Sequence, residues 1–271
     1  MNKIVVPTDF SKNAASALRY AINIANHFGA HILLIHTYEV QSRTGMLINV
    51  RDFIKKDAET DLSKVVKSIK TSLHHGTTLE ARAIEGPTVD TICRFAKGVD
   101  ADMIIMGTQG ATGLKGIVMG SIATGVIKTS KLPVLAIPDE FEYRPLKSVT
   151  LALDSEVTNN PDILAPLIEL CKAYKANIKI LHVKKEKTIA LVDAGIDTFL
   201  SDTPHSFHLV DAEDVNEGIT RFVEEEQPDM LCMIRRNRSF FEQLFHSSMT
   251  SKKASHTKIP LLVMDDRLTD D

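Results

Sequence analysis

The chain has 271 residues, of which 44% are hydrophobic and 25% are charged, and it contains no low-complexity tract. This length fits one large domain or two of about 130 residues, and the composition is that of a globular protein with a buried core. A net charge of −3 and a pI near 6.4 give no electrostatic reason to expect nucleic acid or an anionic membrane surface as a partner.

The N-terminal residues and the cysteines bear on the compartment. The apolar run at residues 4–6 is far too short for a signal sequence or a membrane span. Cys93, Cys171 and Cys232 are odd in number and lie among apolar residues, which is typical of buried thiols in a reducing compartment. We therefore expect a cytoplasmic protein without a disulfide framework.

The sequence repeats itself once, in four blocks that keep their order. The matching blocks are Lys3–Asp9 with Lys147–Asp154, Ile32–Thr37 with Ile178–Val183, Asp102–Met106 with Asp229–Met233, and Lys131–Leu135 with Lys258–Leu262. The offset is 145 to 146 residues for the first two pairs and 127 for the last two, so the second copy is shorter by about one helix. We expect domains at residues 1–140 and 146–268, with the boundary in the polar, proline-containing segment 139–145.

Short apolar runs alternate with stretches of helical period, a pattern typical of βα units around a parallel sheet. In the first copy, strands are predicted at 3–8, 31–37, 78–84, 102–107 and 133–137. The apolar residues of segment 11–28 share one face of a helix that ends at Gly29, and further helices are predicted at 51–75, 87–98 and 119–130. In the second copy, strands are predicted at 147–153, 177–183, 206–210, 229–234 and 260–264.

A glycine-rich loop at residues 106–121 follows the fourth strand and leads into a helix. It holds five of the thirteen glycines of the chain. Glycines let the backbone approach a ligand closely, and free N–H groups at a helix start attract anions such as phosphate. The loop contains neither a Walker A sequence nor the dinucleotide fingerprint. Its pattern is G-x-x-G, nine residues and then Gly-Ser, formed by Gly107, Gly110, Gly120 and Ser121.

This spacing resembles the ATP-binding loop of the universal stress protein family. The segment 7–11 and the closing segment 131–137 also look like the first and last strands of that family. The resemblance is strong in the first half of the chain and weak in the second. It implies an α/β fold of two tandem, doubly wound, mostly parallel five-stranded sheets of the adenine nucleotide alpha hydrolase-like type, in which the two halves form a pseudo-dimer.

The resemblance also implies a nucleotide site in the first half. Pro7, Thr8 and Asp9 would flank the nucleoside, and Thr37 would offer its backbone to adenine. Met106, Gly107, Gly110, Gly120, Ser121 and Ile122 would line the phosphate side. The ligand would be ATP, ADP or AMP, with or without Mg²⁺. If the first and fourth strands are neighbours, Asp9 and Gly107 meet at their carboxyl ends, where open α/β sheets bind ligands.

Each of these residues also has a purely structural interpretation. Asp9 or Ser11 can cap the first helix, a role that we favour for Ser11 but not for Asp9. Ser121 can cap the fourth helix, with or without a ligand. The glycines can also serve a tight loop that binds nothing, as in family members without ATP.

The second copy has lost the glycine pattern. The residues at the four equivalent positions are Ile234, Asn237, Ser247 and Ser248, and the segment between them begins with Arg235, Arg236 and Arg238. We interpret the arginines as a solvated or interface loop, although three guanidinium groups can also hold an anion. Asp154 persists without the loop that it would serve.

The histidines do not predict a metal site. His74 and His75 are sequential and would point to different sides of a helix, whereas His205 and His208 flank a strand start without a cysteine or carboxylate at ligand spacing. We expect ordinary surface or core histidines.

Three hypotheses for function remain open. The first is a nucleotide-binding sensor or regulator of a stress response. The second is a slow ATPase or autophosphorylating protein, for which only Lys115 and Asp9 lie near the loop, with Ser121, Thr112 or Thr124 as acceptors. The third is a scaffold that binds no nucleotide. In each case the apolar last strands, 134–137 and 261–264, are expected to pair with each other rather than stay as exposed edges, and a homodimer of such chains is plausible.

Overall fold

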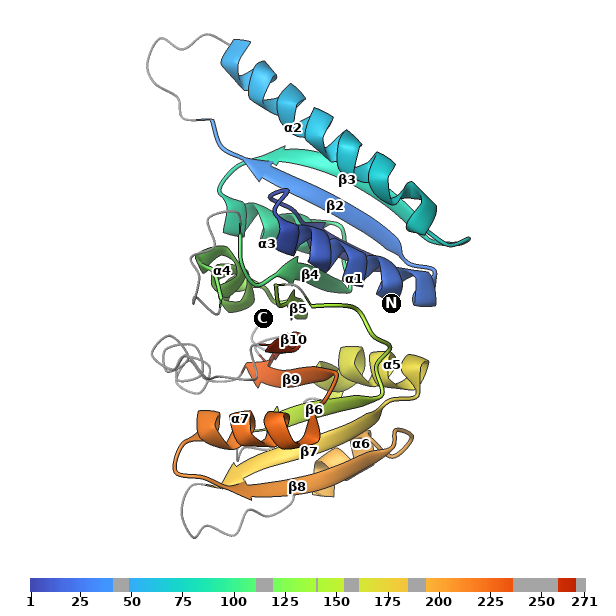
Figure 1. The fold of residues 1–271 in the computed structure, drawn as a ribbon, viewed down its shortest axis with the longest axis vertical. Coiled ribbons are helices and arrows are strands. Elements are labelled where there is room, and N and C mark those ends of the chain that lie inside the picture. Colours follow the sequence, from blue (N-terminus) through green and yellow to red (C-terminus); the bar gives the residue numbers. More distant parts are fainter. Residues whose placement is uncertain are drawn as a thin grey trace. The chain divides into compact units, whose positions relative to one another are not determined.

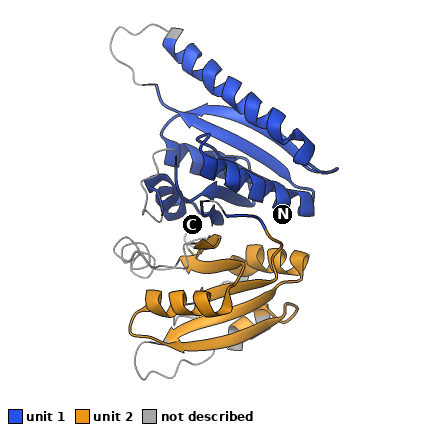
Figure 2. Ribbon diagram, in the orientation of Figure 1, with its two compact units in different colours: residues 1–113, 119–143 blue, residues 114–118, 144–271 orange. Residues whose placement is uncertain are grey.

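The computed structural model describes residues 1–40, 49–110, 119–139, 141–153, 161–184, 194–235 and 258–266. These residues belong to two compact units (Figure 2). The first comprises Met1–Gly113 and Met119–Tyr143, and the second continues from Arg144. Each unit is a parallel sheet with helices packed on it (Figure 1). Within the described ranges, no helix is long and apolar enough to cross a membrane.

The first unit contains a five-stranded parallel sheet in the order β3-β2-β1-β4-β5. Its strands are β1 (Lys3–Pro7), β2 (His31–Tyr38), β3 (Thr78–Glu85), β4 (Met103–Gly107) and β5 (Val134–Ile137). Its helices are α1 (Lys12–Phe28), α2 (Asn49–Ile69, followed by the 3-10 turn η1, Lys70–Ser72), α3 (Thr88–Gly98) and α4 (Ser121–Thr129). From β1 the chain adds β2 and then β3 on one side of the sheet, and it then crosses over to add β4 and β5 on the other side of β1. This arrangement confirms that the first and fourth strands are neighbours, and the strand order reverses between them.

The ends of α1 show how the sequence sets the helix boundaries. Ser11 is its N-cap, because the Ser11 hydroxyl accepts a hydrogen bond from the Ala14 N–H at 3.1 Å. Gly29 ends the helix in the left-handed conformation at φ 66°, where glycine has no steric penalty. The capping role predicted for Ser11 is therefore confirmed, and it fixes where the chain turns from β1 into α1.

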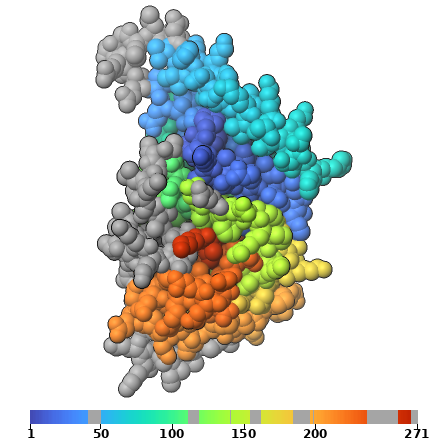
Figure 3. Space-filling model, in the orientation of Figure 1, coloured from blue at the N-terminus to red at the C-terminus, as the bar shows by residue number. Residues whose placement is uncertain are grey.

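Helix α2 packs on β2 and β3 at the edge of the first unit. Leu62 on its inner face is 2% exposed, whereas Phe53 on its outer face is 70% exposed. The outer face forms part of the molecular surface, where its atoms carry the light blue and cyan colours (Figure 3). This long helix therefore packs one face on the sheet and exposes the other.

The second unit repeats the same topology in the order β8-β7-β6-β9-β10. Its strands are β6 (Ser148–Leu153), β7 (Asn177–Lys184), β8 (His205–Asp211), β9 (Met230–Arg235) and β10 (Leu261–Asp265). Its helices are η2 (Pro161–Leu164), α5 (Ala165–Tyr174), α6 (Ala194–Phe199) and α7 (Val215–Glu226). In the described residues α6 has six residues, where α2 has 21. The shorter second copy therefore has a reduced helix at this place rather than none.

The duplication extends to a hydrogen-bonded joint at the base of each sheet. In the first unit, Asp102 Oδ2 accepts from the backbone N–H groups of Asn2 at 2.5 Å and Lys3 at 2.8 Å. In the second, Asp229 Oδ2 accepts from the N–H groups of Lys147 at 2.8 Å and Ser148 at 3.0 Å. An aspartate before the fourth strand thus anchors the start of the first strand in both copies.

One position in the second sheet carries a hydroxyl where the first carries a methyl group. Thr150 is fully buried, and its Oγ1 has no hydrogen-bond partner among the described residues. Its counterpart is Val5, since Val5 lies opposite Ile104 and Thr150 lies opposite Leu231. A buried hydroxyl without a partner costs free energy that an isosteric methyl group does not.

We expect Thr150→Val to raise the free energy of unfolding of the second unit by about 1 kcal/mol, because it removes this hydroxyl and preserves the shape. Urea unfolding followed by circular dichroism measures the change. The reverse substitution at the matched position, Val5→Thr, is expected to destabilise the first unit. A stability loss with Thr150→Val would mean that the hydroxyl is satisfied.

Candidate functional site

A cavity of about 220 Å³ lies at the carboxyl ends of β1, β2 and β4 and at the first residues of α3 and α4. The structure brings together all ten residues that the family resemblance assigned to a nucleotide site. These are Pro7, Thr8, Asp9, Thr37, Met106, Gly107, Gly110, Gly120, Ser121 and Ile122. Parallel strands whose order reverses leave a crevice at this place, which is where open α/β sheets bind ligands.

The segment after β1 forms one wall of the cavity. The Thr8 N–H donates to the Ile35 carbonyl at 2.8 Å, which extends the pairing of β1 with β2 by one residue. Asp9 Oδ1 accepts from the Ser11 N–H at 3.0 Å, so Asp9 orders the turn before α1 but is not its N-cap. A Cβ atom at Gly110 would lie 2.9 Å from Asp9 Oδ2. The Asp9 carboxylate therefore borders the glycine loop.

Asn13, which sequence reasoning did not identify, holds the beginning of the glycine loop. It is 4% exposed; its side-chain amide donates to the Ile137 carbonyl at 3.2 Å, and its Oδ1 accepts from the Gln109 N–H at 2.7 Å. A Cβ atom at Gly107 would lie 2.3 Å from Asn13 Oδ1. Packing against Asn13 alone therefore explains the glycine at 107. The local sequence around Asn13 carries no signal for this role, because both partners lie far along the chain.

Gly120, by contrast, is the N-cap of α4 and has space around it. Its N–H donates to the Thr108 carbonyl at 2.7 Å, its φ is −72°, and an added Cβ would meet no described atom closer than 3.4 Å. The alternative that Ser121 is the N-cap is wrong, because Ser121 is the first helical residue and is exposed. The N–H groups of the first turn, from Ser121 to Ala123, have no partner within a helix and form a positive end that suits an anion.

The part of the cavity wall at the end of β2 and the start of α3 carries side chains rather than backbone. The His36 ring donates from Nδ1 to the Thr8 carbonyl at 2.8 Å and lies 4.4 Å from the ring of Phe10. Beside it, the Thr37 hydroxyl donates to the Thr88 hydroxyl at 3.1 Å. Sequence reasoning missed His36 and Thr88 as lining residues. For Thr88 a signal existed, since it begins the helix that follows the third strand.

The described lining residues include two titratable side chains, Asp9 and His36, and neither lysine nor arginine. Lys115, which belongs to the glycine loop, lies outside the described residues, as do Thr112 and the rest of segment 111–118. In the described part of the cavity, the attraction for an anion therefore comes from the start of α4 rather than from a side-chain cation.

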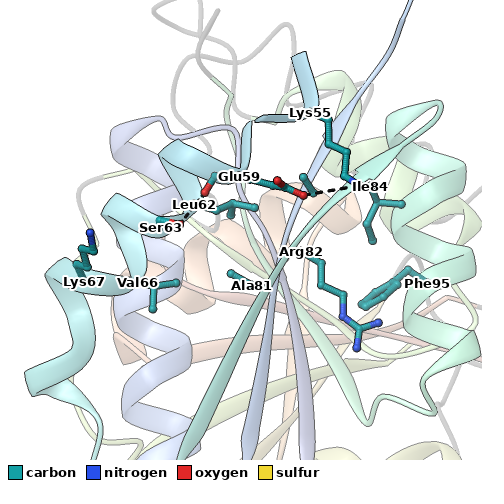
Figure 4. A pocket seen from close by; sticks show the side chains of 11 residues that line it. Lys55, Glu59, Leu62, Ser63, Val66, Lys67, Ala81, Arg82, Ile84 and Phe95 are labelled. Carbon is teal, nitrogen blue, oxygen red and sulfur yellow. Dashed lines mark hydrogen bonds and ion pairs between the residues drawn. The ribbon is translucent and has the colours of Figure 1, made fainter. Parts of the chain in front are cut away.

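A second hollow, of about 740 Å³, lies between α2 and the edge strand β3 (Figure 4). Three of its charged side chains, Lys55, Glu59 and Arg82, are engaged with neighbours. Lys55 pairs with Glu59 at 3.8 Å, and Arg82 pairs with Glu80 at 2.6 Å and covers the Phe95 ring at 5.8 Å. It is more open than the cavity at the strand ends and has no helix N-terminus in its wall. We therefore take the cavity at the strand ends as the candidate site.

At the end of its fourth strand, where the glycine loop begins in the first unit, the second unit has an ion pair. Arg235, the last residue of β9, lies next to Asp265 at the end of β10, and its Nη2 is 2.7 Å from Asp265 Oδ2. Their side chains are 8% and 2% exposed. The interpretation of Arg235 as a solvated residue is therefore wrong, because its guanidinium group is buried in an ion pair with the aspartate at the end of the neighbouring strand. Arg236, Arg238, Asn237, Ser247, Ser248 and Asp154 lie outside the described residues.

The histidines differ in detail from the expectation. His74 and His75 follow η1 and are not on a helix. His205 Nε2 lies 2.9 Å from Asp197 Oδ1, although no carboxylate stood at ligand spacing in the sequence, and His208 bonds to the Ser206 hydroxyl at 2.8 Å. The described residues contain no group of three or more histidine, cysteine or acidic side chains that could hold a metal ion.

The cysteines are free thiols. Cys171 and Cys232 are buried as expected, whereas Cys93 is only half-buried, so the expectation of burial is wrong for Cys93. Burial raises the pKa of Cys171 to about 12 and the pKa of Cys232 well above its ordinary value. Both are therefore protonated packing residues rather than nucleophiles.

Comparisons with known proteins agree with the fold of the two units. Residues 1–138 and 146–265 each match the universal stress protein family. Universal stress protein MJ0531 of Methanocaldococcus jannaschii is 35% identical over 140 residues, which is 50% of this chain and 81% of that protein. Universal stress protein YxiE of Bacillus subtilis is 26% identical over 145 residues, or 50% of this chain and 98% of that protein.

A universal stress protein from Archaeoglobus fulgidus has the same fold over the whole length. Its crystal structure superimposes with a TM-score of 0.72 at 20% identity, covering 97% of this chain and 96% of that one. With both halves of the sequence matched and the tandem α/β fold in place, the chain belongs to the universal stress protein family.

Proposed function

We propose that the first unit binds one adenine nucleotide, ATP or its products ADP or AMP, and that the protein acts as a nucleotide-dependent sensor or regulator of a stress response. The observation that carries this proposal is the convergence of all ten expected residues on one cavity at the strand-order reversal. Family membership supports the stress-response role. The resemblance of the glycine loop to the family's ATP-binding loop supports adenine nucleotide as the ligand.

The two ends of the cavity suit the two ends of a nucleotide. The first turn of α4 offers N–H groups to the phosphates, whereas the apolar side chains of Ile35 and Ile92 and the Thr37 backbone suit the base. Asp9 lies between them. Its carboxylate accepts hydrogen bonds from ribose hydroxyls but repels phosphate, unless Mg²⁺ lies between the two.

Binding is better supported than catalysis. Phosphoryl transfer needs a positioned base, a set of metal ligands or a cation at the transferred group. Asp9 is the one carboxylate among the described lining residues, and no described lysine or arginine reaches the cavity. The pairing of the two halves through β5 and β10, the domain limits at 1–140 and 146–268, a homodimer of such chains and a cytoplasmic location remain predictions.

Mass spectrometry of ligand released from freshly purified full-length protein tests the proposal. We expect an adenine nucleotide in the released fraction. Asp9→Ala is expected to weaken binding moderately and to disturb selection of the nucleoside, because ribose contacts are lost while the phosphate end stays intact. A protein that releases no nucleotide and shows no binding to ATP, ADP or AMP in titration calorimetry would instead favour the scaffold hypothesis.

A further inference from the structure

We propose that the hydroxyl pair of Thr37 and Thr88 recognises the polar edge of the nucleobase, so that side chains, and not the backbone of Thr37 alone, determine base binding. This inference rests on the proposed nucleotide site. The two hydroxyls lie 3.1 Å apart, both residues are half-buried, and both line the cavity of the proposed nucleotide site. They come from different elements, the end of β2 and the first residue of α3.

The hydrogen bond between the two threonines leaves one hydroxyl hydrogen and several oxygen lone pairs free to bond to a ligand. Thr37 donates its hydroxyl hydrogen to Thr88 Oγ1. The hydrogen of the Thr88 hydroxyl is then oriented away from Thr37, and oxygen lone pairs remain available on both residues. The pair can therefore donate to a ring nitrogen and accept from an exocyclic amine. A nucleobase edge carries both groups, whereas a phosphate carries only acceptors.

The second unit offers an internal comparison at the same two positions. Val183 occupies the position of Thr37 in the second strand of that sheet, and Val215 begins α7 as Thr88 begins α3. The alignment of the two helices follows from their shared apolar residues, Ile92 with Ile219 and Phe95 with Phe222, at the same spacing.

In the second unit, which has also lost the glycine pattern, valine thus replaces threonine at both positions. Valine has the same shape as threonine but carries a methyl group in place of the hydroxyl. In that half, Val183 packs against α7, since a Cβ atom at Gly218 would lie 2.6 Å from Val183 Cγ1. Valine fills this place without loss of packing. The fold therefore does not require hydroxyls at these positions. In the first unit, both hydroxyls line the cavity and are placed to bind the nucleobase.

Titration calorimetry of the full-length protein with ATP and with inorganic tripolyphosphate tests the inference. We expect Thr88→Val to weaken ATP binding by roughly three- to tenfold, the equivalent of one neutral hydrogen bond, and to leave tripolyphosphate binding unchanged. Thr88→Ser, which keeps the hydroxyl, should retain the affinity of the wild type. Thr91→Val is the matched control, because Thr91 lies on the same helix, is 2% exposed and does not line the cavity.

The outcomes separate this inference from the proposed function. If the wild-type protein binds ATP and Thr88→Val binds it equally well, the hydroxyl pair has no role in recognition. Equal weakening of ATP and tripolyphosphate would also overturn the inference, because it would indicate a distorted cavity. If the wild-type protein binds neither ligand, the proposed function fails and this inference fails with it.

Discussion

Replacing Gly120 with valine should reduce the affinity for ATP by about a hundredfold or more. A valine side chain at the N-cap of α4 would occupy the space in which phosphate oxygens meet the N–H groups of the first helical turn. Loss of two or three charge-assisted hydrogen bonds costs on the order of 3–6 kcal/mol. Titration calorimetry with ATP measures the loss.

The surroundings of Gly120 make it a better probe than the other glycines of the loop. Its φ of −72° suits any residue, and an added Cβ would meet only ordinary contacts, so the variant should fold. A substitution at Gly107 would not separate an effect on binding from an effect on folding, because an added Cβ there would collide with Asn13. Gly98→Val is the matched control, since an added Cβ there meets nothing within 4 Å. Wild-type affinity in Gly120→Val would place the phosphates elsewhere.

Replacing Arg235 with methionine should lower the free energy of unfolding of the second unit by about 3–5 kcal/mol. The substitution removes the positive charge beside an Asp265 carboxylate that is 2% exposed. Removing one partner of a buried ion pair costs this much because the remaining charge stays desolvated, whereas replacing both partners by apolar residues is often neutral. Denaturant unfolding followed by circular dichroism measures the loss.

The double variant Arg235→Met/Asp265→Leu should recover most of that stability, since it removes both charges of this ion pair. Arg235→Met should not change the affinity for ATP, because Arg235 belongs to the second unit and does not line the cavity. A double variant as unstable as the single one would show that Arg235 acts through packing rather than through its charge. A weakened ATP affinity in the single variant would show that the second unit contributes to nucleotide binding.

The sequence was sufficient to predict the sheets, and its resemblance to a known family proposed the position of the site. Every predicted strand end lies within one residue of the observed one, because apolar runs between glycine, proline and polar residues mark buried parallel strands clearly. The ten site residues were assigned through the resemblance of the glycine loop and the strand ends to a known family, and the structure places all of them around one cavity. Helix ends were harder: residues 73–75 were predicted to be helical but follow η1, where the Asn26 side chain donates to the Ser72 carbonyl and accepts from the His74 N–H, both at 2.9 Å.

Side-chain contacts between residues far apart in the chain could not be predicted from the sequence pattern. Asn13 looks like any polar residue in an amphipathic helix until β4 and β5 bring Gln109 and Ile137 to it. Arg235 looked solvated because its partner, Asp265, lies thirty residues further along the chain. Likewise, the sequence did not predict a role for the Thr37 hydroxyl, because its partner, Thr88, lies on a different element and is brought beside it by the fold. Side-chain pairs of this kind depend on tertiary structure, which local patterns do not encode.

The stoichiometry of ATP binding to the full-length chain tests the central claim most directly. One cavity with a retained glycine pattern, in the first unit, predicts one nucleotide per chain in titration calorimetry, and none per chain in Gly120→Val at the same concentrations. Two nucleotides per wild-type chain would contradict the account, because the second unit would then bind nucleotide without the glycine pattern. One nucleotide that persists in Gly120→Val would contradict it equally, since the site would lie elsewhere.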